Sequence, residues 1–222
     1  MTKKEIRAEL RLVIDDIVEP YGWSNGTLDG YLNEGMDKFC EDTGFFVDFQ
    51  NYSITTEVGV ADYPFDADGR IIEVLEVWNS ATAVRLSQFG ENNRPDFVPT
   101  IDVQQTTPYM WQTDQTTGMA TLYPTPGEVT TFNFRVWRYA RTSFLAMVET
   151  AAPEISQRFH RAFIEYAAFK AYMHHDRERA NLPKATDHLA QYKMYAHDGR
   201  KAFQHYRGTH PHCAPNPLYV FR

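Results

Sequence analysis

Residues 131–137 read Thr-Phe-Asn-Phe-Arg-Val-Trp, and this stretch decides the fold class. Its apolar side chains recur at every second residue, as in a β-strand with one buried face, so Phe132, Phe134 and Val136 are expected to enter one core. From about residue 47 onward, short β-branched and aromatic runs alternate with Pro, Gly, Asn and Asp, which favours strands joined by turns. Strands are predicted at residues 52–57, 70–78, 83–86, 108–112, 119–123 and 131–138, with a hairpin turn at 114–118.

On the N-terminal side of this β-rich segment the apolar residues recur with the period of a helix. One helix is predicted over residues 2–19, beginning with a capping box of Thr2 and Glu5 and ending at Pro20. Its apolar stripe comprises Ile6, Leu10, Val13 and Ile17. A second helix is predicted from Ser24 or Asn25 to about residue 43, because Gly44 favours a stop. The expected apolar face of this helix comprises Leu28, Tyr31, Leu32, Met36, Phe39 and Cys40.

Helical patterns return on the C-terminal side. A helix led by Pro153 is predicted to reach about residue 179, and Asn-Leu-Pro at 181–183 breaks the chain after it. A further helix is predicted over residues 183–206, which Gly199 weakens without ending. Residues 207–222 contain Gly208 and three prolines and finish with the apolar run Leu-Tyr-Val-Phe at 218–221, so an extended arm is predicted.

These segments predict an α+β protein. The helices at both ends of the chain would pack into one bundle, and a small antiparallel β-subdomain would be inserted between them. The predicted parts are an N-terminal helix pair at 1–46, the β-rich insertion at 47–140, a C-terminal helix pair at 141–206 and the extended C-terminal arm at 207–222.

The balance of charge restricts the partners of the protein. The formal net charge is −7, whereas a protein that grips phosphates is basic overall or carries a dense basic stripe. Charge is also segregated, since residues 29–76 hold twelve acidic and two basic residues and residues 156–222 hold eleven basic and five acidic ones. Two surfaces of opposite sign fit head-to-tail contacts between copies in a ring, although solvated faces of different sign are the simpler interpretation. The candidate ring-interface residues are Asp29, Glu34, Asp37, Glu41, Asp42, Arg158, Arg161, Arg177 and Arg179.

The sequence lacks the patterns that carry catalysis or tight ligand binding. It has no Gly-rich phosphate loop and no Gly-x-Ser-x-Gly elbow. His174 and His175 are adjacent on a predicted helix, where neighbouring side chains point about 100° apart and do not easily share one metal ion. A second group, His205, His210, His212 and Cys213, matches no standard metal-site spacing. We therefore expect no enzyme, no cofactor and no metal, and the alternative of a metal-dependent hydrolase would have to use these histidines.

A second alternative is a carbohydrate-binding tail or host-attachment module. Its sugar-binding face would use the aromatic residues of the β-rich segment, although such residues more often form a small core. These residues are Trp78, Tyr109, Trp111, Tyr123, Phe132, Phe134 and Trp137.

Cysteine usage and the N-terminus both favour synthesis in the cytosol. Cys40 and Cys213 are far apart in the sequence and indicate no disulfide framework. Charged residues interrupt any apolar run after Lys4, so no signal peptide is expected.

Four features then occur in a fixed order along the chain. The first is the opening helix pair joined by Trp-Ser-Asn at 23–25, and the second is Gly-Val-Ala-Asp-Tyr-Pro at 59–64 followed by Arg-Ile-Ile-Glu-Val at 70–74. The third is Ala-Thr-Leu-Tyr-Pro-Thr-Pro at 120–126, preceded by Pro-Tyr at 108–109. The fourth is the Pro-led helix at 153–171, rich in Tyr-Ala, followed after a break by residues 185–195. Over about residues 6–206 the chain resembles the head-to-tail adaptor proteins of tailed bacteriophages, also called connector or head-completion proteins. The Leu-Tyr-Pro-x-Pro element is the most specific part, and Pro64 departs from the leucine that usually follows the tyrosine.

The resemblance implies a structural protein of the virion. Adaptors of this family form a ring, with twelve subunits as the known symmetry class, under the portal of the DNA-filled head, and they receive the tail or nozzle protein. They have no catalytic residues and need no cofactor. The implied location is the neck between capsid and tail, after synthesis in the host cytoplasm. The negative net charge fits a lumen that DNA must cross without being held.

The C-terminal arm matches no motif of this family, so its role is inferred from its composition. On its own it does not bury enough apolar surface to offset its ordering entropy, and it should dock onto a neighbouring protein, the portal before others. Aromatic, leucine and arginine side chains of the kind that dominate interfaces provide the anchors. The candidate docking residues are Arg207, His210, His212, Leu218, Tyr219, Phe221 and Arg222.

Overall fold

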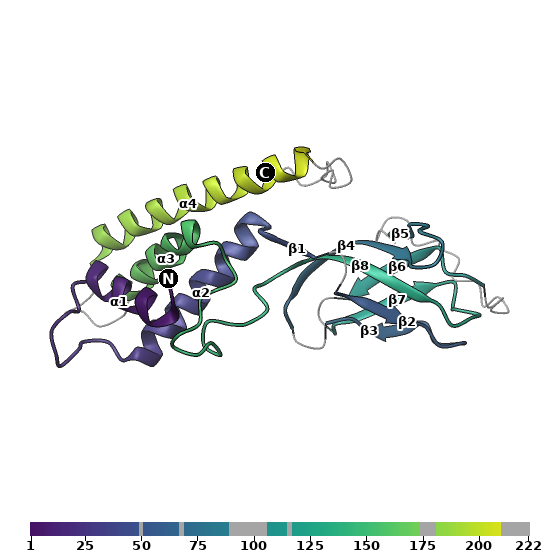
Figure 1. Ribbon diagram of the computed structural model, residues 1–222, viewed down its shortest axis with the longest axis horizontal. Coiled ribbons are helices and arrows are strands. Elements are labelled where there is room, and N and C mark those ends of the chain that lie inside the picture. Colours follow the sequence, from purple (N-terminus) through teal and green to yellow (C-terminus); the bar gives the residue numbers. More distant parts are fainter. Residues whose placement is uncertain (49–50, 67–68, 89–105, 115–116, 174–180, 210–222) are drawn as a thin grey trace. The chain divides into compact units, whose positions relative to one another are not determined.

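The computed structural model describes residues 1–48, 51–66, 69–88, 106–114, 117–173 and 181–209. The chain divides into two compact units, a helical unit of residues 1–45 and 140–222 and a β unit of residues 46–139 (Figure 1). Four helices pack together in the first unit, and two small sheets form the second. The predicted α+β class, with a β insertion between helices from both ends of the chain, is therefore confirmed.

Helix α1 (Lys3–Val13) begins as predicted but ends earlier than predicted. The Thr2 hydroxyl accepts from the backbone N–H of Glu5, and the Glu5 carboxylate accepts from the backbone N–H of Thr2, which completes the capping box. Ile6 and Leu10 are fully buried. The helix stops before Ile17, which is exposed, because Asp15 adopts a left-handed conformation with φ 59° that turns the chain out of the helix.

Helix α2 (Asn25–Thr43) matches its prediction at both ends. The Ser24 hydroxyl caps the N-terminus by accepting from the N–H of Thr27, and Gly44 ends the helix with φ 65°. The predicted apolar face is buried except for Tyr31, which is half-buried.

The third helix starts later than predicted. Pro153 lies in an irregular segment, a short 3-10 turn η2 (Gln157–Phe159) follows, and α3 (His160–Tyr172) begins only there. The Glu154 carboxylate accepts from the backbone N–H of Arg141, so it holds the incoming loop instead of capping a helix. The predicted end near residue 179 is also wrong, because α3 ends at Tyr172; residues 174–180 lie outside the described residues.

Helix α4 (Leu182–Thr209) begins one residue before the predicted start, with the Asn181 side chain accepting from the N–H of Lys184. It continues through Thr209, so Arg207, Gly208 and Thr209, predicted as the start of the arm, are helical. The remaining arm, residues 210–222, lies outside the described residues. Helix α4 thus extends three residues further than the predicted end at residue 206.

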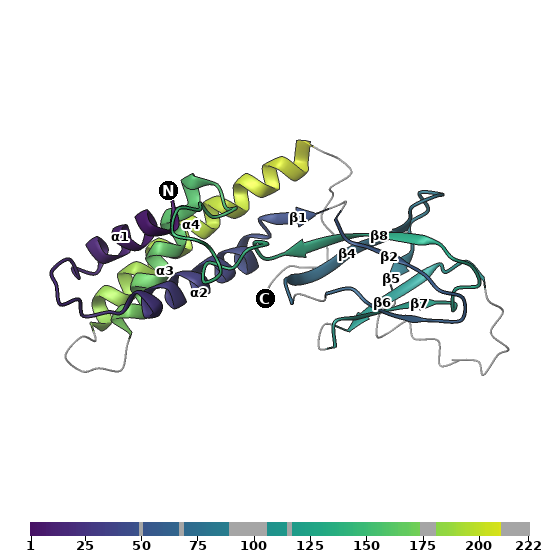
Figure 2. The ribbon, with the colours of Figure 1, turned by 60° about the horizontal axis from the view of Figure 1, so that its bottom comes forward.

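Two glycines set the spacing between the helices. A Cβ atom at Gly35 in α2 would lie 2.8 Å from the backbone oxygen of Phe163 in α3. At Gly199 in α4 it would lie 2.8 Å from Cζ of Phe39 in α2. Gly199 was predicted only as a weak point of its helix, whereas its structural role is close contact with α2. Helices α2, α3 and α4 therefore pack closely against one another, with little space for added atoms (Figure 2).

Replacing Gly35 by alanine is expected to lower the free energy of unfolding by about 1–3 kcal/mol, because backbone of α3 must move to admit the methyl group. Gly30 in the same helix is the matched control, since its added Cβ would meet nothing within 4 Å. Gly30→Ala should raise the free energy of unfolding by about 0.5–1 kcal/mol through helix propensity. Urea denaturation of both variants measures the difference, and equal effects would contradict close packing at Gly35.

The first sheet of the β unit is built around β8 (Thr131–Arg138). On one side β8 pairs with β1 (Phe46–Asp48) and β2 (Ser53–Thr55), and on the other with β4 (Ile71–Asn79), all antiparallel. Phe132, Phe134 and Val136 are buried, which confirms the face predicted from the alternation of apolar residues.

The second sheet has the order β3-β7-β6-β5, formed by Asp62–Pro64, Met119–Tyr123, Met110–Asp114 and Ser87–Gln88. The hairpin between β6 and β7 is as predicted, with Gly118 at φ 66° in its turn. The expectation of purely antiparallel pairing is wrong, because β5 runs parallel to β6. The strand predicted at 83–86 is displaced to β5, and β1 and β3, of three residues each, were not predicted.

Candidate functional site

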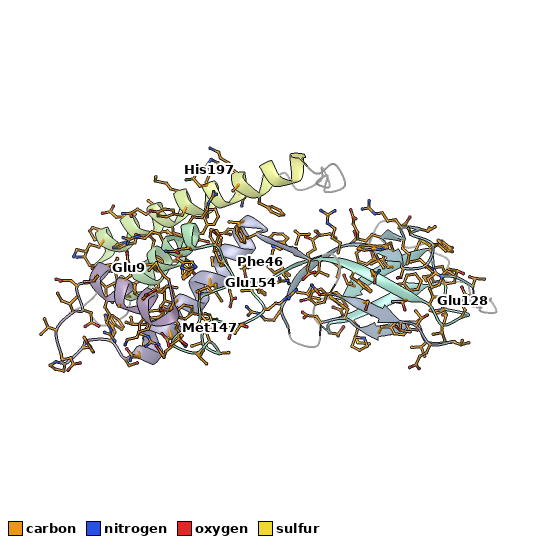
Figure 3. All side chains as sticks on the ribbon, viewed as in Figure 1. Glu9, Phe46, Glu128, Met147, Glu154 and His197 are labelled. Atoms are coloured by element: carbon orange, nitrogen blue, oxygen red, sulfur yellow. The ribbon has the colours of Figure 1, made fainter. Side chains whose placement is uncertain are left out.

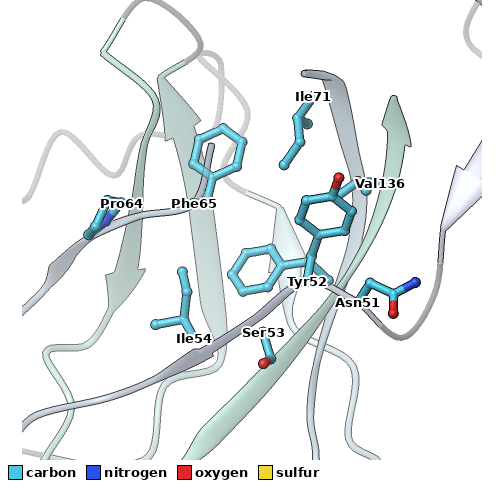
Figure 4. Close-up of a pocket in the computed structure, with 9 residues that line it drawn as sticks. Asn51, Tyr52, Ser53, Ile54, Pro64, Phe65, Ile71 and Val136 are labelled. Atoms are coloured by element: carbon cyan, nitrogen blue, oxygen red, sulfur yellow. The ribbon is translucent and has the colours of Figure 1, made fainter. Parts of the chain in front are cut away.

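A small cavity opens in the β unit between β2, β3 and β4 (Figure 4). It has a volume of about 110 Å³. The lining residues are Asn51, Tyr52, Ser53, Ile54, Pro64, Phe65, Ile71, Phe134 and Val136. Substrate and cofactor sites usually enclose about 300–1,000 Å³ and contain a few convergent polar groups. This cavity is lined by no carboxylate, imidazole, thiol or amine, and its polar side chains are those of Asn51, Tyr52 and Ser53.

The aromatic residues proposed for sugar binding do not form one exposed face. Trp111, Phe132 and Phe134 are at most 1% exposed and belong to the core between the two sheets. Trp78, Tyr123 and Trp137 are half-buried, and Tyr109 is exposed and packs edge-on against Tyr123 at 6.2 Å. Since three of the seven rings serve the subunit's own core, the carbohydrate-binding alternative loses the feature that suggested it.

The histidines within the described ranges lie in separate surroundings and do not form one cluster. His188 in α4 lies 2.6 Å from the buried carboxylate of Glu165 and stacks on Tyr172, while His197 is exposed on α4. Within the described ranges, no group of three or more His, Cys, Asp or Glu side chains could hold a metal ion. His174, His175, His210, His212 and Cys213 lie outside those ranges, and the side chain of His205 is not described.

His160 is buried at the start of α3 and is expected to make stability depend on pH. Its Nε2–H donates to the backbone oxygen of Ile155 at 2.9 Å, and Nδ1 has no hydrogen-bond partner in the described structure. Burial lowers the pKa of His160 below its ordinary value of 6.5, and the bond to Ile155 opposes this only in part. Below pH 6.5 the unfolded chain therefore binds a proton that the folded chain resists.

The contribution of His160 to the free energy of unfolding should be complete above pH 6.5 and decrease as the pH falls below that value. The slope from this one group is at most about 1.4 kcal/mol per pH unit. The His160→Phe variant removes the titrating group, so its stability should fall less between pH 7.5 and pH 5. Denaturant unfolding at each pH measures both profiles, and superimposable slopes would contradict the prediction.

The acidic candidates for the ring interface are largely occupied within the helical unit. Asp29 is buried, and Arg7 donates to both oxygens of its carboxylate at 2.7 and 2.8 Å, with Lys3 Nζ at 3.2 Å. Asp29 was predicted as an interface residue, but it is an internal counter-ion. Asp42 accepts from the Tyr192 hydroxyl at 2.6 Å, and burial, together with this bond, raises the pKa of that hydroxyl.

The other acidic candidates lie nearer the surface of α2 and also have partners in the same subunit. Glu34 pairs with Lys170 of α3 at 2.7 Å, and Glu41 pairs with Lys38 at 3.2 Å. Asp37 accepts from the Asn33 amide at 3.0 Å. The acidic segment of the sequence is therefore partly neutralised before any second copy approaches.

The basic candidates divide into three cases. Arg161 bridges Glu9 of α1 and Glu165 of α3 at 2.7 and 2.6 Å, so it ties the unit together. Arg158 is exposed and its guanidinium lies 4.3 Å from the ring centre of Phe159. Arg177 and Arg179 lie outside the described residues. The structure thus leaves Arg158 as the basic candidate that stands on the described surface.

The docking residues predicted for the arm are mostly beyond the described part of the chain. Arg207 lies in the last turns of α4, and its side chain is not described. The remaining candidates, His210, His212, Leu218, Tyr219, Phe221 and Arg222, lie outside the described residues.

The loop between α1 and α2 has a surface that the sequence did not reveal. Ile17 and Val18 were read as the end of a helix, yet they are 54% and 74% exposed. The signal that could have located them is the pair Asp15-Asp16, which stands shortly before Pro20. Aspartate tolerates left-handed geometry and bonds to nearby backbone, so this pair indicates a helix end before Ile17.

Comparison with known proteins supplies the family. None of the helices in the described ranges has the length and apolarity needed to cross a membrane. No curated protein matches the sequence. The model of the SU10 adaptor protein family matches residues 1–210, which include all the described helices and strands. The chain therefore belongs to the SU10 adaptor protein family, a family of phage head-to-tail adaptors.

Proposed function

We propose that this protein forms the ring that joins the portal of a bacteriophage head to its tail and through which the genome passes. The observation that carries the proposal is the family match over residues 1–210. The cavity of the β unit is smaller than a usual substrate site, which fits a protein whose function lies in its surfaces. The net charge of −7 suits a channel wall that DNA slides past, because a negative surface does not retain phosphates.

The ring proposed here has twelve copies in head-to-tail contact. Such a ring needs two different surfaces on each copy, and their charges set which surfaces meet. The portal would lie on one side of the ring and the tail or nozzle protein on the other. The C-terminal arm from residue 210 would reach the portal, with Leu218, Tyr219 and Phe221 as anchors.

The proposal is tested with DNA-filled heads that carry the portal but lack this protein. Purified protein added to such heads should produce a ring of twelve-fold symmetry at the portal vertex in electron micrographs, and these heads should then accept tails. Bovine serum albumin serves as the unrelated control protein. Binding of the protein to tail fibres or to host surface glycans, with no density at the portal vertex, would overturn it.

A further inference from the structure

Large apolar side chains are exposed together at one end of the helical unit. Of the nine in the described part of this unit, six lie at the end where α1 and α3 finish and α2 and α4 begin (Figures 1 and 2). They are Leu12, Ile17, Val18, Tyr21, Met173 and Leu182. The first four belong to α1 and the loop after it, and we call these four the loop patch. Clustered apolar exposure of this kind marks a surface that binds another protein.

The loop patch is held in one conformation by a buried ion pair. Arg11 pairs with Asp16, and each side chain is only 10% exposed. Arg11 also donates to the Trp23 backbone oxygen at 2.9 Å and to the Asn25 side chain at 2.8 Å, and its guanidinium lies 4.0 Å from the Tyr21 ring centre. A rigid loop loses little entropy on binding, so a loop fixed in this way is suited to docking.

The backbone of the loop is fixed by the same carboxylate. Asp16 accepts from the backbone N–H of Gly22 at 2.6 Å and from that of Trp23 at 3.3 Å. Its neighbours Asp15 and Glu19 are exposed and form no ion pair with any described residue. The loop patch therefore presents apolar side chains next to two carboxylates that form no ion pair within the described ranges.

One side of the outer face of α4 carries basic residues beside an apolar centre, and its other side carries the exposed Asp187 and Asp198. Ala190 is exposed, and Met194 is 69% exposed, although methionine is usually buried. Lys193, His197 and Lys201 follow at intervals of four along one side of these residues, and Figure 3 shows His197 on the outer side of α4. All three are exposed, and none forms an ion pair with a described residue.

We propose that the loop patch of one copy docks on the outer face of α4 of a second copy, with Ile17 and Val18 against Ala190 and Met194. Asp15 and Glu19 then face Lys193 and Lys201. Apolar character and charge sign match at once, which favours a second copy of this chain as the partner. The inference rests on the proposed ring, for which it names the contact.

The same contact within one copy is excluded by geometry. The loop lies at the end of the unit where α4 begins (Figures 1 and 2). Met194 stands twelve residues along that helix, roughly 18 Å away at 1.5 Å per residue, on the side that faces away from the other helices. Two different surfaces that cannot meet in one subunit make a head-to-tail contact, the type that closes into rings.

Charge exchange tests the contact. Asp15→Asn with Glu19→Lys changes the loop, and Lys193→Glu with Lys201→Glu changes the helix. Each double variant should weaken self-association at least about tenfold, and the variant that combines all four substitutions should recover most of the loss. The matched control is Asp187→Asn with Asp198→Lys. It makes the same change in net charge as the loop variant, but at residues on the opposite side of Met194 from Lys193 and His197. It should associate as tightly as the wild type or more tightly.

Sedimentation velocity over a concentration series, and copies bound per portal-bearing head, provide the readouts, and circular dichroism confirms the fold of each variant. Rings that form equally well with either double variant would overturn this contact and leave the adaptor ring intact. Weakening without recovery in the combined variant would also overturn it. A wild-type protein that never self-associates, either alone or on heads, would overturn the contact and the proposed ring together.

Discussion

Replacing Asp29 by alanine is expected to lower the free energy of unfolding by about 3–5 kcal/mol. The carboxylate lies between Lys3 and Arg7 of α1, and each of these cations is at most 10% exposed in its side chain. Lys3 Nζ also contacts the backbone oxygens of Leu145 and Met147 at 3.2 and 3.1 Å. Removal of the carboxylate leaves two positive charges buried with one counter-ion, Glu149, which is half-exposed.

Chemical denaturation measures the loss, with Glu34→Ala as the control in the same helix. Glu34 also forms one ion pair, with Lys170, but its side chain is 50% exposed. Its removal should therefore cost only about 0–1 kcal/mol. If both variants lost the same stability, Asp29 would not be the internal counter-ion that the structure indicates.

Ending the chain at Thr209 is expected to abolish attachment of the protein to portal-bearing heads and to leave its thermal stability nearly unchanged. The family match ends at residue 210, and the described part of α4 runs to Thr209, so the deletion removes no described helix or strand. The removed segment carries the apolar run at 218–221, which contains the anchors proposed for the portal. Electron microscopy of heads mixed with the truncated protein measures attachment.

A full-length variant with Leu218, Tyr219 and Phe221 replaced by alanine separates the anchors from the length of the arm. It should lose attachment as the truncated protein does. Normal attachment of either variant would contradict portal docking by the arm. A large drop in melting temperature on truncation would instead assign residues 210–222 to the core of their own subunit.

Elements with a complete local signal were predicted at the right place. Helix α2 has a serine cap, a glycine stop and a continuous apolar face, and β8 has a strict alternation of apolar residues. The hairpin at Gly118 depends on a turn that few residues other than glycine adopt. In each case the information lies within a few residues of the element, so tertiary contacts had little to change.

Boundaries were misjudged where a distant partner competes with the local pattern. Pro153 and Glu154 have the composition of a helix start, but the Glu154 carboxylate binds the N–H of Arg141 and α3 begins at His160. Ile17 continues the apolar stripe of α1, but Arg11 and Asp16 fold the chain into a loop before it. The short strands β1 and β3 exist because β8 and β7 offer them pairing partners.

The sequence by itself determined the α+β class, the insertion of the β unit between helices and the resemblance to phage adaptors. These follow from periodicity, turn residues and residue order, which are properties of the chain alone. Only the tertiary structure decided which charges are available to other copies. A list of acidic residues cannot separate Asp29, enclosed by Lys3 and Arg7, from Asp15 and Glu19, which face solvent. That distinction depends on contacts between helices, because burial and pairing arise only when distant segments pack together.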